Sequence, residues 1–242
     1  MLWNACQKKI ILVLINLHVK KTRNSFLFFI SKYCGNFGAN YTTYIFLGDT
    51  MKKIVFVLFV LMFPHLVFAY SSNATSTIVM DTDNNKIVYA SNIHKVRSVA
   101  SISKIMTAIL AIESGKLDDE VIVGSEIKST YGSAIYISEG EELTLEDLVY
   151  GLMLRSGNDA SYVIAKYVGG TIDNFIKLMN NKAIEIGMKN TVFNNPNGLD
   201  DNGGNLSTAY DMALLSSYAI KNDTYKKIVG TKKYNLKTNK NV

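Results

Sequence analysis

Ser101 and Lys104 stand three residues apart in the stretch "SVASISKIMTAILAIESG", residues 98–115. On a helix this spacing places two side chains on one face, one turn apart. A lysine that burial keeps neutral can accept the proton of a serine hydroxyl and so make the serine a nucleophile. The same pair is consistent with an N-cap serine followed by a solvated lysine. The apolar neighbours Ile102 and Ile105 favour a buried Lys104.

A second group with chemical potential is Ser156, Gly157 and Asn158, in the stretch "LRSGNDAS" between two expected helices. A hydroxyl and an amide presented by a tight turn suit a proton relay and a hydrogen bond to a substrate. A structural interpretation accounts for the same residues. In that interpretation Gly157 ends one helix, and Asn158 or Asp159 caps the next.

Few other residues could carry nucleophilic or metal chemistry. Both cysteines, Cys6 and Cys34, fall within the first fifty residues, and His94 is the single histidine after residue 69. One histidine cannot form a zinc cluster, and no group of carboxylates near it has ligand spacing. We therefore expect no metal and no cofactor.

The positive charge is concentrated at the N-terminal end. Residues 1–69 contain eight Lys and Arg against one Asp, whereas residues 70–242 contain 18 Lys and Arg against 19 Asp and Glu. The overall charge of +6 therefore does not describe the globular part, which is nearly neutral. A nucleic-acid partner is not expected.

The stretch "MKKIVFVLFVLMFPHLVFAYSS" begins at Met51 with two lysines, continues as an apolar run and reaches the small residue Ala69. This order is typical of a secretory signal peptide, here residues 51–69, and predicts export with cleavage after Ala69. An uncleaved membrane anchor is the alternative, although Pro64 and His65 interrupt a run already near the short limit for spanning. Residues 1–50 are interpreted as a doubtful upstream extension, with a second membrane segment as the alternative.

The elements expected to position these residues are a hairpin followed by helices. Residues 75–92 contain two β-branched runs around a turn, which predicts an antiparallel hairpin. The apolar spacing after Ser101 predicts a helix over 101–114, and Thr144 with Asp147 has the spacing of a capping box for a helix over 144–157. Further helices are expected at about 159–168, 171–186 and 207–221.

The remaining segments are less regular. Residues 117–143 are polar, rich in glycine and short-stranded, and we expect them to wrap the edge of a site. The final stretch from Tyr225 has the composition of strands. Because no βαβ alternation is present, the fold class expected is α+β, with helices packed on an antiparallel sheet.

Two motifs in this order resemble a known family. "SVASISKIMTA" is similar to the first active-site motif, and "SGN" at 156–158 to the second, of the serine-type D-Ala-D-Ala carboxypeptidases. These are the low-molecular-weight penicillin-binding proteins of the DD-peptidase/β-lactamase superfamily. "GGTIDNFIKLMNNKAIEIGMKNTVFNNPNGLD" and "LSTAYDMALL" resemble the segments that follow, so the resemblance runs from about Thr77 to the end.

The resemblance implies an enzyme that removes the terminal D-alanine from peptidoglycan stem peptides through an acyl-enzyme on Ser101. Lys104 would be its general base, with a lowered pKa. Ser156 would relay the proton to the departing D-alanine, and Asn158 would hydrogen-bond the substrate amide. β-Lactam antibiotics would acylate the same serine.

The family's third motif, K-T-G, is missing. Lys237 and Thr238 are followed by Asn239 where the motif needs glycine, and their surroundings resemble the family's segment upstream of that motif. We therefore expect residues 70–242 to be a partial catalytic domain with an incomplete sheet, lacking the C-terminal membrane anchor common in the family. Activity of this chain is consequently in doubt.

Two other functions fit parts of the pattern. A class A-like β-lactamase would need an S-D-N second motif and a deacylating glutamate, whereas this chain has Gly157 and no glutamate in residues 193–204. A catalytically inactive cell-wall-binding fragment is the remaining alternative.

Overall fold

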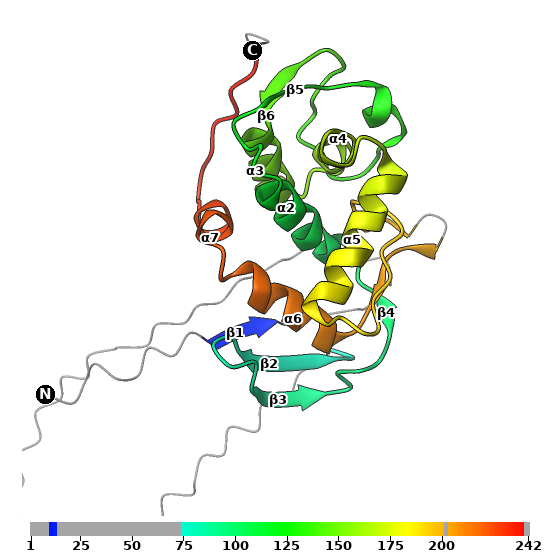
Figure 1. Ribbon diagram of the computed structural model, residues 1–242, viewed down its shortest axis with the longest axis vertical. Helices are drawn as coiled ribbons and strands as arrows, with labels where there is room; N and C mark the ends of the chain where they lie inside the picture. Colours follow the sequence, from blue (N-terminus) through cyan, green and yellow to red (C-terminus); the bar gives the residue numbers. More distant parts are fainter. Residues whose placement is uncertain (1–9, 14–73, 201–202, 240–242) are drawn as a thin grey trace, which may run out of the picture. The chain divides into compact units, whose positions relative to one another are not determined.

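The computed structural model describes residues 10–13, 74–200 and 203–239, all of which belong to one compact unit. Its first elements form a three-stranded antiparallel sheet in the order β1-β2-β3 (Figure 1). The expected hairpin is present as β2 (Thr77–Asp81) and β3 (Ile87–Ser91). β1 (Ile10–Val13), from the stretch interpreted as an upstream extension, pairs with the other edge of β2. The expected signal peptide at 51–69 lies outside the described residues.

Two further pairs of short strands join distant parts of the chain. β4 (Arg97–Ser98) pairs with β7 (Leu206–Ser207), immediately before the segment that contains Ser101. β5 (Glu120–Ile122) pairs with β6 (Glu142–Thr144), which leads directly into the helix that begins at Leu145.

Helices make up most of the rest of the described chain. A 3₁₀ turn, η1 (Ala100–Ser103), leads into the first of them, and a second, η2 (Ser125–Ser129), interrupts the irregular segment. The α-helices are α2 (Lys104–Glu113), α3 (Leu145–Arg155), α4 (Asn158–Gly169), α5 (Ile172–Ile186), α6 (Ala209–Ala219) and α7 (Asp223–Val229).

The helix boundaries follow from capping residues. Thr144 and Asp147 form the expected capping box at the start of α3. Thr171, Thr208 and Asn222 each accept a hydrogen bond from a backbone N–H in the first turn of α5, α6 and α7, respectively. Each such cap stabilises its helix by about 1 kcal/mol.

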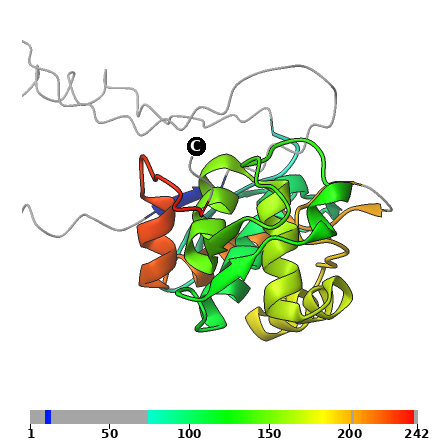
Figure 2. The same cartoon turned by 90° about the horizontal axis from the view of Figure 1, so that it is seen from above.

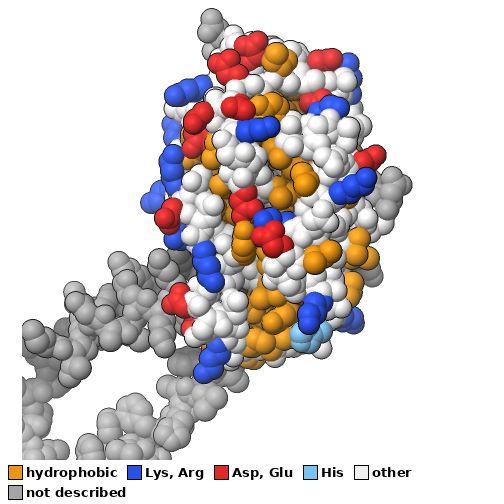
Figure 3. Space-filling model, in the orientation of Figure 1, with side chains coloured by type: hydrophobic (Ala, Val, Ile, Leu, Met, Phe, Trp, Pro, Cys, Tyr) orange, Lys and Arg blue, Asp and Glu red, His pale blue; other side chains and the backbone are white. Residues whose placement is uncertain are grey.

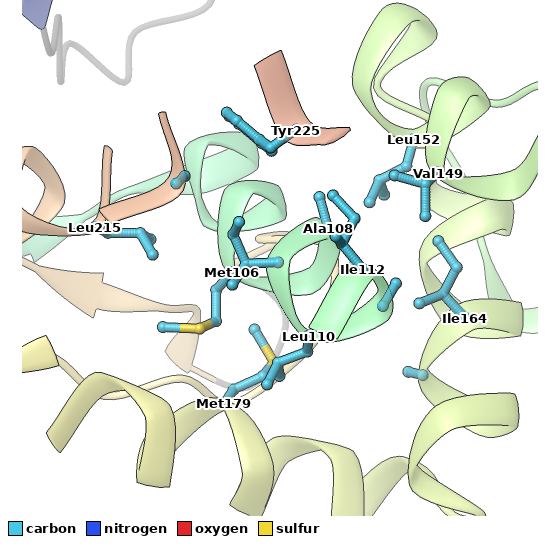
Figure 4. Packing of buried hydrophobic residues seen from close by; sticks show 14 of the residues in the cluster. Met106, Ala108, Leu110, Ile112, Val149, Leu152, Ile164, Met179, Leu215 and Tyr225 are labelled. Carbon is cyan, nitrogen blue, oxygen red and sulfur yellow. The ribbon is translucent and has the colours of Figure 1, made fainter. Parts of the chain in front are cut away.

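The central element is α2, which contacts α3, α4, α5, α6 and α7. Eight of its ten residues are buried, so its apolar surface is enclosed on nearly all sides. Figure 4 shows Met106, Ala108 and Ile112 of this helix among side chains of the surrounding helices. Full burial of each large apolar side chain contributes roughly 1.5–3 kcal/mol, so this packing holds the first turn of α2 in a fixed position.

The sheet and the outer helices flank this centre. α6 packs on β2, and Figures 1 and 2 place α5 and α7 on opposite sides of α2. Acidic and basic side chains are interspersed on the face shown in Figure 3, as expected for a nearly neutral domain. Within the described residues, no helix is both long enough and apolar enough to cross a membrane.

The structure differs from the sequence prediction in two places. The helix predicted over 101–114 begins with a 3₁₀ turn, and the α-helix proper starts at Lys104. The strands expected after Tyr225 are wrong: this residue lies in α7, and residues 231–239 pair with no strand among the described residues. The tail is held by side chains instead, with Tyr234 stacked on Tyr150 at 3.6 Å between ring centroids.

Candidate active site

The nucleophile and base candidates lie at the start of the central helix, and the structure brings them together. Lys104 Nζ lies 3.2 Å from Ser101 Oγ. Ser101 is exposed in η1, whereas Lys104 at the start of α2 is only 2% exposed. The pair therefore places an accessible hydroxyl next to a buried amine.

The alternative interpretation of an N-cap serine and a solvated lysine is wrong for this geometry. The N-cap residues of η1 and α2 are Val99 and Ser103, and neither helix has a side-chain capping bond. The hydroxyl of Ser103 donates to the carbonyl of Ala100 instead, at 2.8 Å. Ser101 thus makes no structural cap, and its hydroxyl faces the lysine.

Lys104 has two further partners, both of them fixed acceptors. Its Nζ lies 2.7 Å from Asn158 Oδ1 and 2.6 Å from the backbone carbonyl oxygen of Asn197. A neutral amine has two N–H groups and one lone pair. If both N–H groups donate to these two oxygens, the lone pair is left for the Ser101 hydroxyl, which is the arrangement a general base requires.

Burial lowers the pKa of Lys104 from its ordinary value to about 8, because removing the ammonium from water penalises the charged form. The three atoms that contact Nζ belong to uncharged groups, so no carboxylate opposes this effect. About one tenth of the amine is then neutral at pH 7, far more than for a lysine with the ordinary pKa. The lowered pKa expected from the sequence is confirmed.

Asn158 connects Lys104 to the irregular segment 117–143. Its Oδ1 accepts from Lys104, and its Nδ2 donates to the backbone carbonyl of Tyr131. Its backbone N–H donates to the carbonyl of Ser133 at 2.8 Å. The irregular segment 117–143 therefore does border the site. Since both ends of the Asn158 amide contact protein atoms here, a bond to a substrate stays a prediction.

Ser156 ends α3 in a left-handed conformation, with φ 58° and ψ 36°. A non-glycine residue in this region is strained, and such strain is common where a side chain must be presented in a particular direction. Its hydroxyl makes no hydrogen bond with the described residues. The relay assigned to Ser156 stays a prediction, because nothing in the contacts tests it.

A buried carboxylate holds the bordering segment in place. Asp159, only 4% exposed, accepts hydrogen bonds from the backbone N–H groups of Ile135 and Ile137. Ile135 packs so closely on Gly151 and Gly157 that a Cβ at Gly151 would lie 2.7 Å from it. Small residues at these two positions therefore let the segment approach the turn that carries Asn158.

Lys237 and Thr238 lie away from this site. The backbone N–H of Lys237 donates to Asp147 near the start of α3, and Thr238 Oγ1 donates to Glu141 at 2.7 Å. The first turn of α3 also bonds residues 117–119, which follow the C-terminal end of α2. Ser101 lies at the opposite, N-terminal end of α2. Lys237 and Thr238 therefore do not take the place of the missing third motif.

Sequence reasoning missed the third partner of Lys104. The stretch "NNPNGLDDNGGN" is dense in asparagine and glycine, which is typical of a loop and gives no sign that a backbone carbonyl of this stretch contacts Lys104. It supplies the Asn197 carbonyl and places Gly198 directly against the carbonyl of Ala100. Ala100 itself has φ 46°, a strained conformation for a non-glycine residue immediately before the nucleophile candidate.

Comparison with known proteins identifies the family. The family model described as D-alanyl-D-alanine carboxypeptidase matches residues 66–242. The chain belongs to the D-alanyl-D-alanine carboxypeptidase family. It is 37% identical over 171 residues to the D-alanyl-D-alanine carboxypeptidase DacF of Bacillus subtilis (strain 168), covering 69% of this chain and 44% of that relative. To DacC of Escherichia coli (strain K12) it is 36% identical over 165 residues, covering 64% of this chain and 41% of the relative.

Solved structures of D-alanyl-D-alanine carboxypeptidases and penicillin-binding proteins share the fold. The crystal structure of DacD from Francisella tularensis matches with a TM-score of 0.62 and 39% identity, over 66% of this chain and 40% of that one. Penicillin-binding protein 6B from Escherichia coli matches with a TM-score of 0.63 and 31% identity, over 73% and 61%. The expected α+β class is confirmed. The chain spans less than half the length of the two curated relatives above.

Proposed function

We propose that this chain carries the serine acylation site of a D-Ala-D-Ala carboxypeptidase, which removes the terminal D-alanine from peptidoglycan stem peptides. The observation that supports this most directly is the buried, uncharged environment that holds Lys104 Nζ 3.2 Å from Ser101 Oγ. In this proposal Lys104 accepts the hydroxyl proton while Ser101 Oγ attacks the carbonyl of the terminal D-Ala-D-Ala amide. The names of the relatives give the substrate class.

The subsequent steps follow from the same arrangement. The proton passes through Ser156 to the nitrogen of the departing D-alanine as the C–N bond breaks, and water then hydrolyses the ester on Ser101. Asn158 holds the lysine and bonds the substrate amide. Penicillin and other β-lactams acylate the same serine. Export of the chain, with cleavage near Ala69, would place the site outside the cytoplasm, where the stem peptides are.

Labelling with a fluorescent penicillin tests this proposal. The folded chain is expected to take up the label covalently, and Ser101→Ala is expected to abolish it. Thr107→Ser in α2 is a suitable control, because serine retains the hydroxyl that donates to the backbone carbonyl of Pro196 in the neighbouring loop. Release of D-alanine from a peptide ending in D-Ala-D-Ala then distinguishes a carboxypeptidase from a β-lactamase. A folded chain that takes no label would favour a catalytically inactive wall-binding fragment.

A further inference from the structure

The turn Asn195–Leu199, between α5 and β7, presents the carbonyl of Asn197 to Lys104. A backbone carbonyl has no rotatable side chain, so its direction depends entirely on how the turn is held. Three amide side chains are buried here: Asn195, Asn197 and Asn205 are 9%, 2% and 0% exposed. Buried amides are retained where their hydrogen bonds are satisfied, and those of Asn195 and Asn205 bond the backbone of the turn itself.

Asn195 fixes the peptide group that contains this carbonyl. Its Oδ1 accepts from the N–H of Gly198 at 2.6 Å and from that of Asn197 at 3.3 Å. The N–H of Gly198 and the C=O of Asn197 belong to one planar trans peptide group and point in opposite directions. Asn195 therefore holds one side of the group while Lys104 contacts the other. Its Nδ2 also donates to the carbonyl of Leu199 at 2.8 Å.

Asn205 in turn fixes Asn195. Its Oδ1 accepts from the N–H groups of Asn194 and Asn195, at 2.7 and 3.1 Å, and its Nδ2 donates to the carbonyl of Asn195 at 2.9 Å. From the opposite side, Thr107 Oγ1 of α2 donates to the carbonyl of Pro196 at 2.7 Å. The turn is thus bonded both to itself and to the helix that carries the lysine.

We propose that Asn195, which does not touch Lys104, is a positioning residue for acylation of Ser101. By orienting the Asn197–Gly198 peptide group, it provides the second permanent acceptor of Nζ and keeps the turn closed over the amine. The lone pair of the lysine is thereby directed at the Ser101 hydroxyl. This role rests on the proposed function, since it concerns the base of that reaction.

Loss of the Asn195 side chain should change the pKa of Lys104 in one direction. Burial is the cause of the lowered pKa of Lys104, and the groups at Nζ are uncharged: Ser101 from η1, Asn158 from α4 and the backbone of Asn197. The nearby carboxylates already accept hydrogen bonds from other groups. Asp159 accepts from the backbone of residues 135–137, and Asp200 accepts from the hydroxyl of Ser98. A loosened turn admits water to Nζ, so the pKa rises towards its ordinary value.

The chain offers a matched control in Asn180. Its side chain also makes three bonds to backbone, one with the carbonyl of Ile176 and two with the N–H and carbonyl of Phe193. It therefore anchors the same loop by the same kind of amide–backbone hydrogen bonds, at Phe193, two residues before Asn195. Asn180→Ala should cost about as much stability as Asn195→Ala, without changing the peptide group at Lys104.

The experiment titrates Lys104 directly, by the ¹³Cε chemical shift in protein labelled with [¹³C]lysine, with the signal assigned by Lys104→Arg. In Asn195→Ala the titration midpoint is expected to rise by about one pH unit or more, and acylation by fluorescent penicillin at pH 7.5 to slow by at least about tenfold. In Asn180→Ala both should match the unmodified chain, although the midpoint of urea unfolding falls in both variants.

An unchanged Lys104 midpoint in Asn195→Ala, or an equal shift in Asn180→Ala, would overturn the proposal. If Asn195→Ala does not fold, Asn195→Ser, whose hydroxyl can accept one of the two N–H bonds, should give a smaller shift in the same direction. The titration needs no catalysis. A chain that shows the shift but never reacts with penicillin would therefore contradict the proposed function and leave the role of Asn195 in setting the lysine intact.

Discussion

The chemistry proposed for this chain depends on the protonation state of one buried side chain. Lys104 is surrounded by neutral oxygens, and its pKa of about 8 arises from burial. The reactive form is the neutral amine, whose fraction increases as the pH rises towards 8. We therefore expect the rate of acylation by fluorescent penicillin to rise from pH 6 through pH 8, where about half of the amine is neutral, and to level off above about pH 9. A rate independent of pH over this range would argue against Lys104 as the base.

Replacing Lys104 with arginine separates charge from basicity. Arginine retains a cation at the site but cannot become neutral in a protein, so it cannot accept the Ser101 proton. We expect Lys104→Arg to reduce the acylation rate by about 10²- to 10⁴-fold, the usual contribution of general base catalysis. Circular dichroism should show that the variant is folded. A retained rate would mean that another group removes the proton.

Burial lowers the pKa of Lys104, whereas a carboxylate introduced beside its amine should raise this pKa. In Asn158→Asp an oxygen close to 2.7 Å from Nζ would carry negative charge, which favours the ammonium form. We expect the pKa of Lys104 to rise by about one unit or more, so that acylation at pH 7.5 slows and partly recovers at higher pH. Asn174→Asp, at an exposed position on α5, adds the same charge and should leave the pH profile unchanged.

At the scale of elements, the close contact between the loop and η1 limits what residue 198 can be. Gly198 has φ +84°, and a Cβ there would lie 1.9 Å from the carbonyl oxygen of Ala100. Gly198→Ala must therefore push the loop away from the nucleophile turn. We expect a loss of about 2–4 kcal/mol in the free energy of unfolding, from strain and overpacking together, and a large loss of acylation.

Gly187 supplies the control for this substitution. It has φ +88°, but a Cβ there would meet no atom within 4 Å. Gly187→Ala should cost only about 1–2 kcal/mol, from backbone strain alone, and acylation should be unaffected. Urea unfolding of both variants compares the two costs. Equal destabilisation would show that the contact with Ala100 relaxes without consequence.

Most of the helices could be predicted from the sequence because their signals are local. The capping box of Thr144 and Asp147 and the apolar spacing after Ser101 depend on neighbours a few residues apart. The 3₁₀ turn of η1 and the contribution of Asn197 could not be predicted in this way. The first residue of η1, Ala100, lies directly against Gly198, almost a hundred residues later, and such a distant contact gives no local signal. The contribution of Asn197 is made by its backbone carbonyl, which is independent of residue type.

At the scale of the whole molecule, the tail shows how distant contacts override local preference. Residues from Tyr225 onward have the composition of strands, yet 231–239 are held by contacts with α3 and with the residues immediately before it. Tyr234 stacks on Tyr150 at an interplanar angle of 8°, and its hydroxyl donates to Asp147 at 2.9 Å. These contacts join the end of the described chain to its middle, so they stabilise the fold without contributing to the chemistry at Ser101.

Substitution of Tyr234 tests that separation of stability from chemistry. Tyr234→Phe retains the stack and loses the bond to Asp147, whereas Tyr234→Ala loses both. We expect losses of about 1 and about 2–3 kcal/mol in the free energy of unfolding, respectively, measured in urea. Tyr136→Ala, at a position 80% exposed, should cost little. Because the tail lies beyond the far end of α2 from Ser101, acylation by penicillin should persist in both Tyr234 variants while they remain folded. A loss of acylation in folded Tyr234→Phe would mean that the tail also supports the site.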